Sequence, residues 1–136
     1  MVLNLTETGE DVADEICQVL EKLEEVLKKH PASDIPFIVV TITCNSSGGQ
    51  PVSMQNMKDV HGLAHQYGVR VLYDSARFAE NAYFIKTREA GYRDKSIREI
   101  VREMFGYADM MTMSSKKDAI VNIGGFIALR EEELFK

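Results

Sequence analysis

The sequence is poor in cysteine, in long apolar runs and in positive charge, and each shortage excludes a class of protein. The two cysteines, Cys17 and Cys44, are too few for a disulfide framework and suit a reducing compartment. No apolar stretch is long enough to cross a bilayer, and the N-terminal residues lack the charge pattern of a signal peptide. The formal net charge of −5 is not that of a protein with a basic surface for nucleic acid. We therefore expect a cytoplasmic protein that binds neither membrane nor nucleic acid.

What the sequence does contain is an alternation of helical and strand patterns within 136 residues, of which 45% are hydrophobic. Apolar spacing and capping residues predict helices over 12–27, 54–67, 79–85 and 97–105, and strands over 37–43, 69–73, 108–113 and 119–129. The strand over 37–43 is short and β-branched, which is typical of a strand buried on both faces in a parallel sheet. The order of the elements predicts an α/β fold with a right-handed βαβ unit.

Polar residues follow three of the predicted strands, at the point where each strand ends. Asn45 follows the first strand, Asp74 and Arg77 follow the second, and the segment Ser114–Lys117 follows the third. Taken singly, Asn45 suits a turn former, Asp74 a helix cap and Arg77 a surface cation. The lysines of the third segment suit a solvated pair in a hairpin turn. Ligands of open α/β sheets bind beyond the carboxyl ends of the strands, so we expect these side chains to share one edge.

The residue types at this edge match the requirements of pyridoxal phosphate. An aspartate such as Asp74 can pair with a protonated ring nitrogen, and Arg77 with Asn45 can donate hydrogen bonds to a ring oxygen. Lys117 can hold the cofactor covalently, and Ser114 can bind its phosphate.

Two histidines share a helix face and suggest a second kind of site. His61 and His65 are four residues apart, so both can reach the same metal ion. The local sequence offers no acidic or cysteine partner to complete a ligand set, and we do not expect a metal there.

Three segments of the sequence resemble a known family, the β-eliminating lyases, which include tryptophanase and tyrosine phenol-lyase. The segments are Thr41–Ser53, Asp74–Lys86 and Met113–Asp118, and the resemblance extends from about Ile35 to the C-terminus. It implies a three-layer, mostly parallel sheet, as in the large domain of fold type I pyridoxal-phosphate enzymes of the aspartate-aminotransferase type.

The resemblance also implies a role for individual residues. Lys117 would hold the cofactor and move the α-proton of the substrate, Asp74 would contact the ring nitrogen, and Asn45 and Arg77 would contact the ring oxygen. Ser114 would bind the phosphate.

Further implications concern a metal, the assembly and the substrate. Lys116 would lie beside the active site, and the backbone carbonyl of Asn122 would bind potassium. Members of the family are homotetramers that act on amino acids. The segment Asp74–Glu80 and the pair Asn45–Ser46 are more similar to tryptophanase, which converts tryptophan to indole, pyruvate and ammonia, and tyrosine phenol-lyase is the alternative.

The length departs from this family, whose members are several-fold longer. We therefore expect residues 1–136 to be one partial domain, a segment from the middle of the large cofactor domain, without the small domain. The loop that cups the phosphate and the arginine that binds the substrate carboxylate would lie outside it. We expect the isolated chain to be inactive or nearly so, and the alternative is a non-catalytic folded remnant that self-associates or binds a partner.

Overall fold

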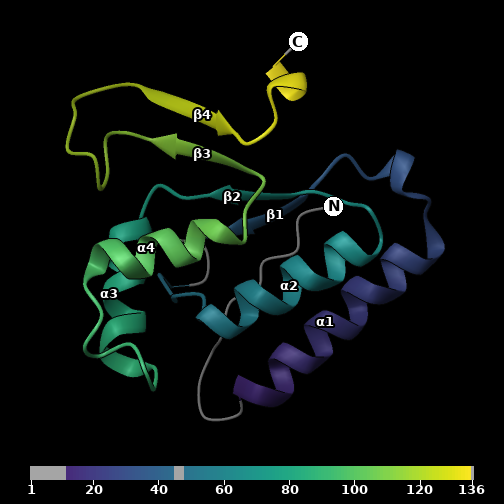
Figure 1. The fold of residues 1–136 in the computed structure, drawn as a ribbon, viewed down its shortest axis with the longest axis horizontal. Coiled ribbons are helices and arrows are strands. Elements are labelled where there is room, and N and C mark those ends of the chain that lie inside the picture. The colour runs from purple at the N-terminus through teal and green to yellow at the C-terminus, as the bar shows by residue number, and fades with distance from the viewer. Residues whose placement is uncertain (1–11, 45–47, 136) are drawn as a thin grey trace.

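The structure is a computed structural model that describes the backbone of residues 12–44 and 48–135. Its sheet has the strand order β1 (Ile38–Thr41), β2 (Val71–Asp74), β3 (Met110–Ser114) and β4 (Gly125–Leu129) (Figure 1). The first three strands are parallel, and β4 pairs antiparallel with β3. The predicted α/β class with a mostly parallel sheet is confirmed.

The described part of the chain contains four α-helices, and two of them begin after a serine cap that the sequence predicts. They are α1 (Val12–Lys29), α2 (Met54–Gln66), α3 (Phe78–Arg88) and α4 (Ile97–Gly106), with short 3₁₀ turns at Ala32–Asp34 and Glu132–Phe135. The Ser53 hydroxyl accepts the backbone N–H of Asn56, and Ser96 forms a reciprocal capping box with Glu99. No described helix combines the length and the apolar character needed to span a membrane.

The helices lie on one side of the sheet, and the core lies between the two (Figure 1). Alternate residues of the first two strands, Ile38 and Val40 in β1 and Val71 and Tyr73 in β2, are buried against the helices. The residues between them are only half-buried. The prediction that the segment 37–43 is buried on both faces is therefore wrong for this chain, because no described helix covers the opposite face.

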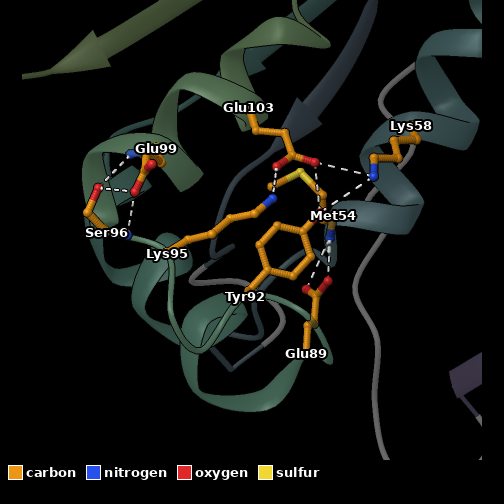
Figure 2. A network of polar contacts seen from close by, with 8 residues as sticks. All are labelled: Met54, Lys58, Glu89, Tyr92, Lys95, Ser96, Glu99 and Glu103. Carbon is orange, nitrogen blue, oxygen red and sulfur yellow. Dashed lines mark hydrogen bonds and ion pairs between the residues drawn. The ribbon is translucent and has the colours of Figure 1, made fainter.

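A polar network ties α2 to the connection between α3 and α4 (Figure 2). Glu103 accepts a hydrogen bond from the Tyr92 hydroxyl at 2.8 Å and forms ion pairs with Lys95 at 2.8 Å and Lys58 at 3.3 Å. The carboxylate of Glu89 accepts the first backbone N–H of α2 at 3.1 Å. The network links α2 to α4 and to the connection that precedes α4.

Candidate cofactor site

Residues from three parts of the chain line one cavity at the carboxyl edge of the parallel strands. The cavity has a volume of about 160 Å³ and is lined by Thr41, Ile42, Thr43, Cys44, Asp74, Ala76, Arg77 and Lys117. Asp74 is the last residue of β2, next to the end of β1, so the sheet itself brings it there. Of the residues predicted for the site, Asp74, Arg77 and Lys117 meet in this cavity.

Arg77 has a donor group without an acceptor. Its Nε is buried and has no hydrogen-bond partner among the described residues, while Nη1 lies 3.3 Å from the carboxylate of Glu80. The side chain is 34% exposed. A buried N–H without an acceptor costs free energy, so an oxygen supplied by a ligand in the cavity would be stabilising.

Lys117 lies in the hairpin connection between the antiparallel strands β3 and β4. It also borders the cavity. The backbone N–H of Ile120 donates to the Lys117 carbonyl at 2.9 Å. The next residue, Asp118, accepts the Ala79 N–H at 2.7 Å through Oδ2 and so caps the start of α3. This cap holds the exposed lysine beside α3, and sequence reasoning missed it because the two residues lie 39 apart.

A second feature that the sequence did not reveal shapes the part of the cavity wall that Thr43 forms. Thr43 is buried and has a φ of +52°, a conformation that is unusual for a β-branched residue. Its hydroxyl donates to Oδ1 of Asn81 at 3.2 Å. Oδ1 of the buried Asn81 also accepts the Val52 N–H at 2.8 Å, and its Nδ2 donates to the Val52 carbonyl at 2.9 Å. These contacts hold the strained turn, and strain of this kind is common at ligand sites.

Other predicted site residues do not reach this cavity. Ser114 is half-buried at the end of β3, and Lys116 and Asn122 are exposed in the β3–β4 connection. None of the three is among the described residues that line the cavity. Asn45 lies outside the described residues. The roles expected for these positions stay predictions.

The family model and the relatives found by comparison with known proteins point to the same family. The family model described as "Beta-eliminating lyase" matches residues 10–135. A probable beta-eliminating lyase of Trichomonas vaginalis is 60% identical over 117 residues, which cover 86% of this chain and 25% of that protein. A tyrosine phenol-lyase of Fusobacterium nucleatum is 53% identical over 116 residues, with 85% and 25% coverage. The chain thus spans about a quarter of the length of these relatives.

Solved structures agree on the fold. A putative aromatic amino acid beta-eliminating lyase/threonine aldolase from Exiguobacterium has a TM-score of 0.54 at 21% identity, covering 76% of this chain and 25% of that chain. A putative L-allo-threonine aldolase of Listeria monocytogenes has a TM-score of 0.52 at 21% identity, with 68% and 22% coverage. At this identity the likeness concerns the fold alone.

Proposed function

The chain belongs to the beta-eliminating lyase family, and from this premise we propose that it is a segment of the cofactor-binding domain of a pyridoxal-phosphate-dependent carbon–carbon lyase. The observation that carries the proposal is the meeting of Asp74, Arg77 and Lys117 at one cavity on the carboxyl edge of the sheet. Pyridoxal phosphate requires a lysine amine and a partner for its ring nitrogen, and Lys117 and Asp74 offer both.

The cavity residues fit pyridoxal phosphate, because the unpartnered Nε of Arg77 supplies the donor that the ring oxygen needs. When bound, the cofactor withdraws electrons from the Cα of an amino-acid substrate. Asp74 would accept the hydrogen bond of the ring nitrogen, and Arg77, together with Asn45, would donate to the ring oxygen. Lys117 would hold the cofactor covalently and carry the proton removed from the substrate Cα.

The roles of three further residues and the assembly are also part of this proposal, and they are supported only by the resemblance to the family. Ser114 would contact the phosphate, Lys116 would lie beside the site, and the Asn122 carbonyl would bind potassium in a homotetramer. The rest of the pocket would come from outside residues 1–136. Because catalysis requires all groups in one productive geometry, we propose that the isolated chain is inactive or nearly so.

For the substrate, the comparisons favour tyrosine over tryptophan. Two of the relatives, from Fusobacterium nucleatum and Clostridium tetani, are named tyrosine phenol-lyase, and each is 53% identical over 116 residues. The preference for tryptophanase drawn from local motifs has no such support. We therefore propose that the enzyme of which this chain is a segment eliminates phenol from tyrosine and, with one water, releases pyruvate and ammonia.

Trapping of the cofactor tests the proposal. The chain is incubated with pyridoxal phosphate, reduced with borohydride and mapped by mass spectrometry, next to Lys117→Arg and the matched control Lys116→Arg. We expect the label at Lys117, its loss in Lys117→Arg and its retention in Lys116→Arg. Label spread evenly over surface lysines, or unchanged in Lys117→Arg, would refute the assignment of Lys117 as the lysine that holds the cofactor.

A further inference from the structure

A cluster of two histidines and a carboxylate lies at the opposite end of the strands from the cofactor cavity. His61 and His65 belong to the second half of α2, and Asp109 directly precedes β3. Oδ2 of Asp109 accepts the backbone N–H of Val71, the first residue of β2, at 2.8 Å. The sheet therefore holds the carboxylate in place at its amino edge, beside the histidine-bearing face of the helix.

The three side chains are close enough to share one ion. Each offers one ligand atom, and these atoms all lie within 4.8 Å of one another. Nε2 of His65 is 2.9 Å from Oδ2 of Asp109, and the centroids of the two imidazole rings are 3.9 Å apart. The acidic partner that the local sequence did not offer thus comes from a residue 44 positions away from His65.

His61 also has a ring nitrogen without a partner. Its Nδ1 is buried and has no hydrogen-bond partner among the residues that the structure describes. A simple ion pair between His65 and Asp109 would need no second imidazole at this position. A site that uses two imidazoles and a carboxylate accounts for all three residues.

We propose that His61, His65 and Asp109 form a binding site for a divalent transition metal of the zinc type. Two imidazoles and a carboxylate are a zinc donor set, and water would fill the remaining position. Tetrahedral bonds of about 2.0–2.1 Å require ligand atoms roughly 3.3 Å apart. The pair His65–Asp109 is already within that separation. The side chain of His65 is 45% exposed, so it can rotate toward the ion without disturbing the core.

Calorimetric titration of the full chain with zinc chloride tests this site. We expect a single zinc ion per chain, and an affinity weakened at least about tenfold in His65→Ala and in Asp109→Asn. The matched control is His30→Ala, because His30 is an exposed histidine outside the cluster, and its affinity should be unchanged. Circular dichroism checks that each variant is folded. If Asp109→Asn fails to fold, His65→Ala decides the test, because the His65 side chain is partly exposed and its removal should leave the fold intact.

Cobalt substitution identifies the donor atoms. We expect the absorption of a cobalt ion bound by nitrogen and oxygen, lost in His65→Ala. A sulfur-to-cobalt charge-transfer band would assign the metal to cysteine and overturn the proposal. Zinc binding that is equal in all variants, absent from the original chain, or lost in His30→Ala would overturn it as well.

Discussion

At the scale of single residues, the site depends on side chains whose partners are distant in sequence. The placement of Asp74 and Lys117 at one edge was predictable, because the pattern puts Asp74 at the end of one strand and Lys117 shortly after the end of the next. The partners that hold the cavity walls, Asn81 for Thr43 and Asp118 for the start of α3, were not. Their hydrogen bonds join segments that only the tertiary fold brings together. The same reason explains why Asp109 was not recognised as a partner of His65.

Removing the buried amide of Asn81 should destabilise the chain. Asn81→Ala leaves both polar backbone groups of Val52 without their partners in the core, so we expect the free energy of unfolding to fall by roughly 2–3 kcal/mol. Urea unfolding followed by circular dichroism measures this. Tyr83→Ala on the exposed face of the same helix is the control, since its side chain is 59% exposed. Equal stability of the two variants would refute the assigned role.

At the scale of elements, periodicity and capping predicted the helices and strands well, whereas pairing required the structure. Ser53 and Ser96 begin α2 and α4 as the sequence indicates. The pattern over 119–129 predicted a longer strand, but β4 covers only Gly125–Leu129 and pairs antiparallel. The short connection from β3 permits a hairpin and leaves no room for a crossover helix. Both lysines of the pair therefore lie in a hairpin connection, and Lys117 also borders the cavity.

The network around Glu103 predicts a pH-dependent link between helices. Partial burial would raise the pKa of Glu103, but hydrogen bonds from Lys95, Tyr92 and Lys58 outweigh it and lower that pKa below 4.5. A lowered carboxyl pKa stabilises the fold above the unfolded value, and this stabilisation disappears as the pH falls through the folded value. Glu103→Gln should therefore cost about 1 kcal/mol at neutral pH and almost nothing in strong acid.

Thermal unfolding at a series of pH values measures that difference. Glu21→Gln, at an exposed position of α1, is the control and should follow the original chain throughout. A cost of Glu103→Gln that does not change with pH would argue against the ionised network.

At the scale of the whole molecule, the chain carries one wall of a site and an open sheet edge. Figure 1 shows β4 at the end of the sheet. Phe126 and Ile127 on this strand are 52% and 62% exposed, and the nearby Ile123 is 89% exposed. Exposed apolar residues on an unpaired edge promote association. This supports the alternative in which the chain binds a copy of itself or a partner.

We expect the isolated chain to self-associate through this edge. Sedimentation velocity should show species larger than a monomer, and Ile127→Lys should shift them toward the monomer because edge lysines oppose strand pairing. Lys28→Ala, on the exposed surface of α1, should leave the distribution unchanged. A monomer at all concentrations would contradict the expectation.

A crystal structure of the reduced pyridoxal-phosphate adduct would test whether Asp74, Arg77 and Lys117 surround a single cofactor ring. We expect continuous density from Nζ of Lys117 to the cofactor, with the ring nitrogen in hydrogen-bond contact with Asp74 and the ring oxygen in contact with Nε of Arg77. An adduct on Lys117 whose ring nitrogen faces solvent, away from Asp74, would contradict it.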